Sequence, residues 1–218
     1  MHELPWHCMG GLIRLGILSP HPENDALPEK QYIDAQQLLD DSYQLGLDIL
    51  ESGFVPNFIV GIWRGGTPVG IAVQELLDYF GIKTDHIAIR TSSYKGIEHR
   101  AGNVQVHGLG YVIKNINAED SLLIIDDVYD TGLSVQQVVA DLHAECRRNT
   151  PEIRIATPYF KPGNNKTDRA PDYFVHETDA WLVFPHELSG LSAAEILERK
   201  PGVERDRKST RLNSSHSS

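Results

Sequence analysis

The chain has 218 residues, of which 30 are acidic and 20 basic, giving a formal net charge of −10. This length suits one sizeable α/β core, and the acidic balance argues against a nucleic-acid partner, which would favour a basic surface. No run approaches the roughly 18 apolar residues of a membrane span, and the two cysteines, Cys8 and Cys146, provide neither a disulfide framework nor a metal-ligand spacing. We therefore expect a cytoplasmic protein with no membrane partner and no secretion signal.

The N-terminal quarter divides into an irregular segment and a helix. Four prolines and scattered glycines predict irregular structure over residues 1–30, to which we assign no role. A helix is predicted over residues 31–51, ending near Gly53. Its apolar face is predicted from the spacing of Leu39, Tyr43, Leu47 and Leu50.

The next unit is a strand followed by a helix, with two glycines between them. Residues 58–63 predict a strand, and Thr67 followed by Pro68 predicts a capped helix start. The helix is predicted to end at Gly81 and to direct inward Val69, Val73, Leu76, Leu77 and Phe80. Between strand and helix lies the peptide Arg64-Gly65-Gly66, whose glycines let backbone amides approach an anion closely. Taken alone, two glycines after a strand more often form only a turn.

A second strand and a long loop follow. Residues 83–90 predict a strand in which Ile87 and Ile89 alternate with polar residues. Residues 91–110 are polar, contain glycines and are too many for a tight turn, so we predict a mobile loop with a returning strand around Val104 and Val106.

The most informative segment covers residues 121–134. Leu122 to Ile125 predict a strand buried on both faces, and the acids that follow it are Asp126, Asp127 and Asp130. The next four residues, Thr131, Gly132, Leu133 and Ser134, lead into a helix whose apolar positions are Val135, Val138, Val139, Leu142 and Cys146. Such a loop lies at the carboxyl end of a strand, where open α/β sheets bind ligands. The helix amides would hold a phosphate and the carboxylates would face sugar hydroxyls or Mg²⁺, which together indicate a sugar phosphate. The alternative is an acidic turn that only caps the helix.

The C-terminal part completes the predicted fold. Strands are predicted near residues 153–160 and 173–175, so strands and helices alternate through most of the chain. This order predicts an α/β fold with a mostly parallel central sheet and helices on both faces. The predicted domain covers residues 31–200. The Ser-rich end, residues 201–218, has almost no apolar content, and we interpret it as a disordered tail of non-native origin.

The acidic segment resembles the phosphoribosyl-pyrophosphate (PRPP) signature of the type I phosphoribosyltransferases. The shared pattern is an apolar strand, two adjacent acids, two apolar residues, and then Asp-Thr-Gly-x-Ser. The resemblance implies that Asp126 and Asp127 hold the ribose hydroxyls, directly or through Mg²⁺. It also implies that residues 130–134 bind the 5-phosphate and that Asp130 is the general acid/base.

Two further segments resemble parts of the same family. Arg64, Gly65 and Gly66 are similar to its pyrophosphate loop, in which the Arg-Gly type of peptide is often cis. Ser92, Ser93 and Tyr94 resemble the flexible loop of the 6-oxopurine branch. A loop of this kind would close over the substrates and exclude water from a cation-like transition state.

The late part of the chain resembles the base-binding hood of the hypoxanthine, guanine and xanthine phosphoribosyltransferases, here residues 161–191. Lys161 occupies the position of the lysine that donates to the purine O6, and an ammonium suits a 6-oxo group because it only donates. Trp181 stands where an aromatic side chain stacks on the base, with Leu182 beside it. One departure is His186, where family members often have a tryptophan. It leaves open which 6-oxopurine is preferred.

Taken together, the resemblance implies a purine salvage enzyme that transfers the phosphoribosyl group of PRPP to hypoxanthine, guanine or xanthine. Mg²⁺ would be the cofactor, PRPP and a 6-oxopurine the ligands, and a homodimer or homotetramer the assembly. Two alternatives remain at this point: a regulatory protein of the same fold that senses PRPP or purines without catalysis, and a phosphoribosyltransferase for another base.

Overall fold

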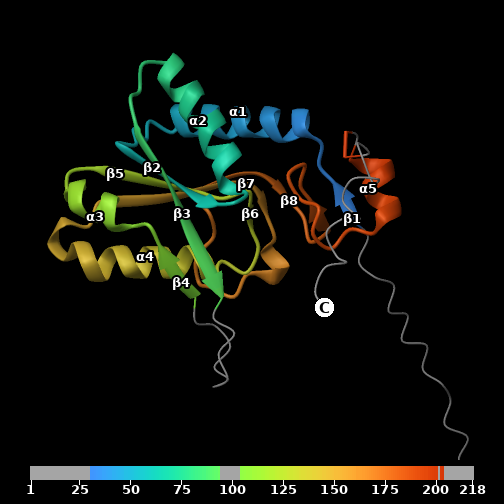
Figure 1. Cartoon of the computed structure of the whole chain (residues 1–218). Coiled ribbons are helices and arrows are strands. Elements are labelled where there is room, and N and C mark those ends of the chain that lie inside the picture. Colours follow the sequence, from blue (N-terminus) through green and yellow to red (C-terminus); the bar gives the residue numbers. More distant parts are fainter. Residues whose placement is uncertain (1–29, 94–103, 201, 204–218) are drawn as a thin grey trace, which may run out of the picture.

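The computed structural model describes residues 30–93, 104–200 and 202–203 (Figure 1). The helices are α1 (Ala35–Glu51), α2 (Gly66–Tyr79), α3 (Gly110–Asn115), α4 (Leu133–Cys146) and α5 (Ala193–Arg199). The strands are β1 (Lys30–Tyr32), β2 (Phe58–Trp63), β3 (Asp85–Ser93), β4 (Val104–His107), β5 (Ser121–Ile125), β6 (Val128–Tyr129), β7 (Glu152–Phe160), β8 (Tyr173–Glu177) and β9 (Trp181–Val183). Of the predicted irregular segment 1–30 and the predicted tail 201–218, the structure describes only Lys30, in β1, and residues 202–203.

The main sheet is mostly parallel, as predicted. Its strand order is β4-β3-β2-β5-β7-β6, and β8 also pairs with β7. The β3–β4 pair is antiparallel and the other pairs of this sheet are parallel. A smaller parallel pair, β1 with β9, lies beside it. The α/β class and the layer order are thus confirmed.

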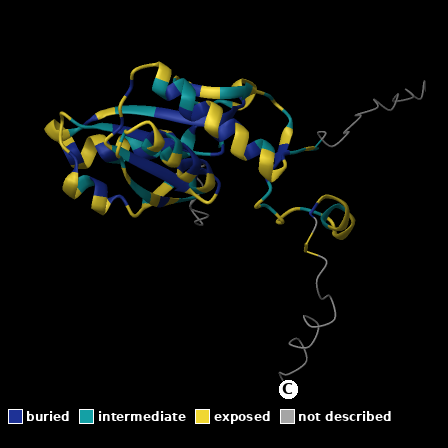
Figure 2. Ribbon diagram, turned by 90° about the horizontal axis from the view of Figure 1, so that it is seen from above, coloured by how far each residue is buried: buried dark blue, intermediate teal, exposed yellow. Residues whose placement is uncertain are grey.

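Helices cover both faces of the sheet, with α1 and α2 on one side and α3 and α4 on the other (Figure 1). Successive residues of one strand point to opposite faces. Leu123 and Ile125 of β5 therefore join the core under α1 and α2, while Leu122 and Ile124 join the core against α4. The buried strands lie between helices with exposed outer faces (Figure 2). This two-sided burial explains why β5 is an unbroken apolar run.

Helix α1 starts later than predicted and presents a different face to the core. Residues 30–32 form β1, and Asp34 caps the helix by accepting the Gln37 N–H at 2.8 Å. Leu39 and Tyr43, predicted to face inward, are 36% and 38% exposed. The buried positions are Leu38, Asp41, Ser42, Leu45, Gly46 and Ile49. The predicted stripe was wrong at Leu39 and Tyr43, because two polar residues and a glycine belong to the buried face, whereas Leu50 does pack against the core.

Helix α2 also departs from its predicted start. It begins at Gly66, so Thr67 lies inside its first turn instead of capping it. Phe80, predicted to point inward, follows the last helical residue and is 50% exposed. Val69, Val73 and Leu77 are buried as predicted.

The strand predicted at 83–90 is shifted and longer. As β3, it runs to Ser93 and pairs with β4, so Ser92 and Ser93 belong to a strand and not to a loop. The predicted returning strand is β4. Tyr94 lies outside the described residues. The sequence patterns did not predict β1, α3, β6 or α5.

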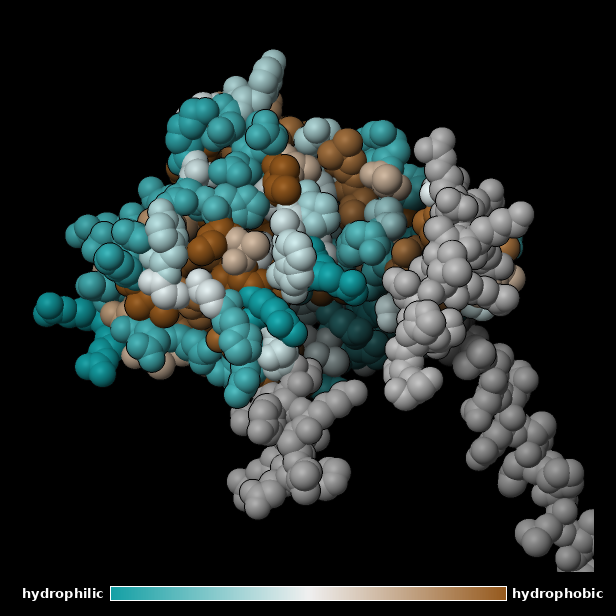
Figure 3. Space-filling view, viewed as in Figure 1, coloured by the Kyte–Doolittle hydropathy of each residue, from teal (hydrophilic) through white to brown (hydrophobic). Residues whose placement is uncertain are grey.

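The described surface is largely polar. In the space-filling view (Figure 3), hydrophilic side chains dominate the visible face and apolar side chains form separate patches between them. Across the described ranges, no helix is both long and apolar enough to cross a bilayer.

Candidate active site

Three parallel strands deliver the site residues to one edge of the sheet. Strands β2, β5 and β7 are neighbours, and their registers align Gly61 with Ile125 and Ile125 with Ala156. The segments that follow these strands are 64–66, 126–134 and 161–165. Because carboxyl ends of parallel strands lie at the same edge, segments far apart in sequence meet there.

The acidic pair after β5 is tightly held. Asp127 is buried, and its N–H donates to Oδ1 of Asp126 at 3.0 Å. Burial, and then the neighbouring Asp127 carboxylate, raise the pKa of Asp126 well above its usual range. A cation or a hydroxyl donor placed against this pair would relieve the repulsion.

The two glycines after β2 let the neighbouring loops touch. A Cβ on Gly65 would lie 1.8 Å from Oδ2 of Asp127, and one on Gly66 would lie 2.2 Å from the Ile125 carbonyl oxygen. Only glycine fits at these two positions, so the 64–66 segment packs directly on the acidic segment. Arg64 is exposed, and the cis peptide bond is Trp63–Arg64, one residue before the Arg-Gly bond expected from the resemblance.

A small hollow lies at the start of α4. Its volume is about 80 Å³, and it is lined by Asp126, Val128, Tyr129, Asp130, Thr131, Gly132, Ser134 and Val135. Gly132 caps the helix with a φ of 73°, and a side chain there would clash with the Tyr129 ring. The first-turn amides of a helix lack helical partners and carry its positive dipole end. The hollow is therefore suited to an anion the size of a phosphate. Leu133, the first residue of α4, does not line it.

A larger cavity, about 480 Å³, lies beside this hollow and shares Val128 and Asp130 with it. Its lining residues are Asp127, Val128, Asp130, Lys161, Asn164, Asp179, Trp181, Leu182, Phe184, Glu187 and Ser189. Lys161 is 8% exposed, and its Nζ lies 3.9 Å from Oδ2 of Asp130. Asn164 donates to Oδ1 of Asp130 at 2.9 Å. We call this space the main cavity.

The main cavity brings together residues predicted from different parts of the chain, namely Asp127, Asp130, Lys161, Trp181 and Leu182. Asn164, Asp179 and Glu187 were not predicted. Asp179 accepts the Gly163 N–H at 3.1 Å and so fixes the turn that carries Asn164. The sequence signal for these residues was weak, because amides and acids near turns are common on protein surfaces.

Strand β9, which forms one wall of the main cavity, is supported by β1 from the start of the described chain and by α5 from its end. Strand β1 pairs with β9, and Nζ of Lys30 lies over the Trp181 ring at 5.7 Å. Glu195 of α5 accepts from Lys30 at 2.7 Å and from Tyr32 at 2.8 Å. Lys30 is the main reason why the pKa of Glu195 lies well below its usual value. Blue β1 and red α5 lie side by side in Figure 1. The resemblance located the base-binding hood at residues 161–191; from here on, the name hood means β1, β9 and α5, with the turns that join them to the chain.

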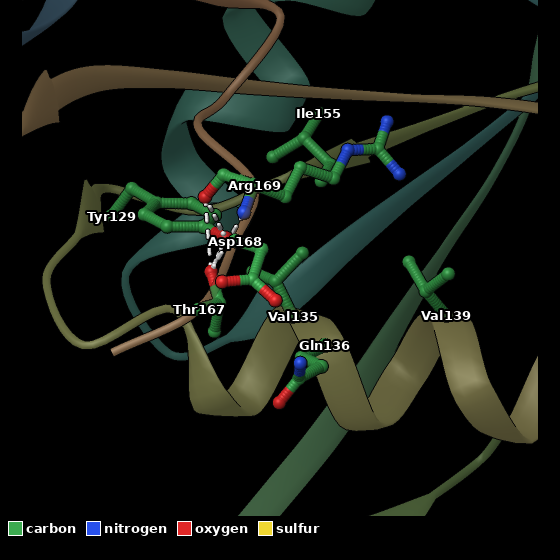
Figure 4. Close-up of a pocket in the computed structure, with 8 residues that line it drawn as sticks. All are labelled: Tyr129, Val135, Gln136, Val139, Ile155, Thr167, Asp168 and Arg169. Atoms are coloured by element: carbon green, nitrogen blue, oxygen red, sulfur yellow. Dashed lines mark hydrogen bonds between the residues drawn. The ribbon is translucent and has the colours of Figure 1, made fainter. Parts of the chain in front are cut away.

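A second cavity, about 210 Å³, adjoins the hollow, and Figure 4 shows the residues that line it. It shares Tyr129 and Val135 with the hollow, and its other lining residues are Gln136, Val139, Ile155, Thr167, Asp168 and Arg169. The Tyr129 hydroxyl bonds to Oγ1 of Thr167 and to the carbonyl of Arg169, both at 3.0 Å. These bonds hold the ring in place as the wall between the two spaces.

Comparisons with known proteins match most of the described chain. The family model described as "Phosphoribosyl transferase domain" matches residues 29–191. The purine phosphoribosyltransferase from Pyrococcus horikoshii is 27% identical, with a TM-score of 0.59 over 75% of this chain and 97% of that one. A hypothetical protein from Neisseria gonorrhoeae with bound ppGpp is 17% identical, with a TM-score of 0.61 over 79% and 96% of the two chains. The xanthine-guanine-hypoxanthine phosphoribosyltransferase from Helicobacter pylori is 18% identical, with a TM-score of 0.57 over 72% and 92%. No curated protein matches the sequence.

Proposed function

Because the chain belongs to the phosphoribosyl transferase domain family, we propose that it transfers the 5-phosphoribosyl group of PRPP to a 6-oxopurine and releases pyrophosphate. The observation that carries the proposal is the main cavity, where the buried Lys161 ammonium and the Trp181 ring share one space with Asp130. An ammonium can donate to a 6-oxo group but opposes an amino group, so this wall disfavours adenine.

Each part of the site would bind one part of the substrates. The 5-phosphate would occupy the hollow, on the amides of residues 131–134. The ribose hydroxyls would donate to Asp126 and Asp127, and the pyrophosphate would lie against Arg64, Gly65 and Gly66. The purine would enter the main cavity between Trp181 and Leu182, with Lys161 at its 6-position.

The proposed reaction replaces the C1–pyrophosphate bond by a C1–nitrogen bond on the opposite face of the ribose. In this reaction Asp130 would take or return the purine proton; Asn164 and Lys161 contact its two carboxylate oxygens and so orient it. Most of the rate would come from positioning and electrostatics.

Mg²⁺ fits this site only if protein carboxylates and substrate oxygens coordinate it together. Within residues 30–93, 104–200 and 202–203, no group of three or more His, Cys, Asp or Glu side chains could hold a metal ion. Mg²⁺ is typically bound by one or two carboxylates together with substrate oxygens, which Asp126 and Asp127 could provide. When bound, it would neutralise charge on the departing pyrophosphate.

A spectrophotometric assay with PRPP, Mg²⁺ and, in turn, hypoxanthine, guanine, xanthine and adenine tests the proposal. Turnover of at least one 6-oxopurine, with adenine inert and activity lost in EDTA, is the expected result. PRPP binding with all four bases inert would favour a sensor of the same fold. Turnover of adenine instead would reassign the base.

A further inference from the structure

The turn after β9 projects His186 from the hood. Glu187 N–H donates to the Phe184 carbonyl at 3.0 Å, with Pro185 in the second position, where proline favours a β-turn. The Glu187 side chain accepts from Phe184 N–H at 3.2 Å, and the buried Lys200 donates to the Phe184 carbonyl. The turn is therefore fixed on both sides of His186.

The His186 ring is fixed as well. It stacks on the Phe184 ring, with centroids 5.7 Å apart and planes 12° apart. Phe184 is 2% exposed and meets the Tyr159 ring edge-on at 5.7 Å. Phe184 also lines the main cavity. The orientation of His186 thus depends on a wall of the proposed base pocket.

Across the site, His186 reaches the acidic pair. Its Nε2 lies 3.4 Å from Oδ2 of Asp127, whose carboxylate rests on the backbone of Gly65. Among the described residues, no other basic side chain has a nitrogen within 4.0 Å of Asp127. One contact therefore joins the base side of the site to the ribose side.

We propose that His186 is a positioning residue that couples base binding to PRPP binding. A base that packs on Phe184 in the main cavity favours the arrangement of the turn in which His186 contacts Asp127, and Asp127 then keeps the orientation that receives the ribose hydroxyls. By linkage, PRPP strengthens base binding by the same factor. The inference rests on the proposed function, because it takes Asp127 as a ribose-binding acid.

Calorimetry measures the coupling directly. The affinity for PRPP, in the presence of MgCl₂, is measured twice, once without and once with a saturating concentration of an inert base analogue. The analogue is the 9-deaza form of whichever base turns over, in which carbon replaces the attacking nitrogen. The ratio of the two PRPP affinities is the coupling ratio. In the wild type, the analogue should tighten PRPP binding by about fivefold or more, the usual lower range of coupling between sites. In His186→Phe, which keeps the stack but has no N–H, the ratio should fall to about one.

Two amide variants locate the effect at one nitrogen. His186→Gln can place its amide near the position of Nε2 and should restore part of the ratio. His186→Asn places its amide at the position of Nδ1, away from Asp127, and should behave like His186→Phe. If His186→Phe fails to fold, equal ratios in the Gln and Asn variants overturn the inference.

A matched control is available in the same molecule. His176 packs against Tyr159 with ring centroids 5.0 Å apart and planes tilted by 31°, and its Nε2 lies 2.8 Å from Asp41, far in sequence from the acidic segment. His176→Phe should lower the melting temperature about as much as His186→Phe but leave the ratio unchanged.

The possible failures are distinguishable. A wild-type ratio near one, or an unchanged ratio in His186→Phe, overturns the inference and leaves the proposed function standing. A wild type that neither binds PRPP nor turns over any base contradicts the proposed function and the inference with it.

Discussion

Asp130 illustrates how single residues are oriented in this site. Its side chain is 45% exposed, yet one oxygen accepts from Asn164 and the other lies 3.9 Å from Nζ of Lys161. A carboxylate held in this way is accessible to a ligand without being free to rotate. This combination suits a group that exchanges a proton with a bound base.

Replacing Asp130 by asparagine should lower kcat by about 10²–10⁴-fold, because an amide keeps the hydrogen-bonding shape but cannot take a proton. Steady-state turnover at saturating PRPP and base measures the effect. Asp168→Asn, which changes an acid lining the second cavity, is the control and should retain full turnover. Unchanged turnover in Asp130→Asn would remove this residue from the acid/base role.

Gly65 offers a second test at the scale of one residue. In Gly65→Ala, the new methyl would lie 1.8 Å from Oδ2 of Asp127, so the loop or the acid must move. A displacement of about 1 Å in a catalytic site can cost about 10²-fold, and we expect a comparable fall in kcat/KM for PRPP. Gly110→Ala is the control, since a Cβ there meets nothing within 4 Å. Equal activity of the two variants would contradict the close packing of these loops.

Sequence patterns placed some residues of the site but not others, for a physical reason. Asp126, Asp130 and Lys161 each follow a strand, and parallel strands bring their carboxyl ends together whatever the details of packing. The contact between His186 and Asp127 depends on a turn after β9 and on the stacking of one ring. Such contacts are set by tertiary structure, which local periodicity does not encode.

At the scale of elements, the same distinction explains the outcome for the helices. The apolar residues of α4 lie on successive turns along one face of the helix. Their predicted burial is confirmed at Val135, Val138 and Leu142. Helix α1 instead buries Asp41, which accepts from Tyr159 at 2.7 Å and lies 2.8 Å from His176. A buried acid with partners 118 and 135 residues away cannot be recognised from hydrophobic spacing.

Helix α5 is short, but its contacts predict a large effect on the hood. A chain ending after Ser192 would lose the Glu195 bonds to β1 and the Lys200 bond to Phe184. One lost buried hydrogen bond costs about 1–3 kcal/mol, and each kcal/mol lowers Tm by about 2–4 °C in a domain of this size. We expect a lower Tm and a kcat/KM for the base reduced by more than about tenfold, because a loosened wall misplaces the ring.

The matched variant is a chain ending after Val203, which retains all of these contacts. Thermal unfolding and steady-state kinetics on the two shortened chains give the comparison. Wild-type values for the chain ending after Ser192 would show that α5 does not support the base pocket. A reduced Tm or kcat/KM for the chain ending after Val203 would extend the functional domain beyond the proposed residues 31–200.

At the scale of the whole molecule, alternation of strands and helices predicted the sheet well. Parallel strands need crossover helices, so the order of elements alone restricts the topology. The hood was harder to predict, because β1 and β9 are three residues long and their pairing joins residue 30 to residue 181. A strand of three residues gives no periodic pattern to detect.

This pairing of distant strands sets an order of events during synthesis. The ribosome makes β1 first, but its partner β9 and its anchor Glu195 come only after the whole main sheet. Domains form from the N-terminal side as the chain emerges, so β2, β5, β7 and the loops between them can assemble while β1 waits. The loop that carries residues 126–134 is then complete before β9 is in place, so a nascent chain passes through a stage in which the hollow can form and the main cavity cannot.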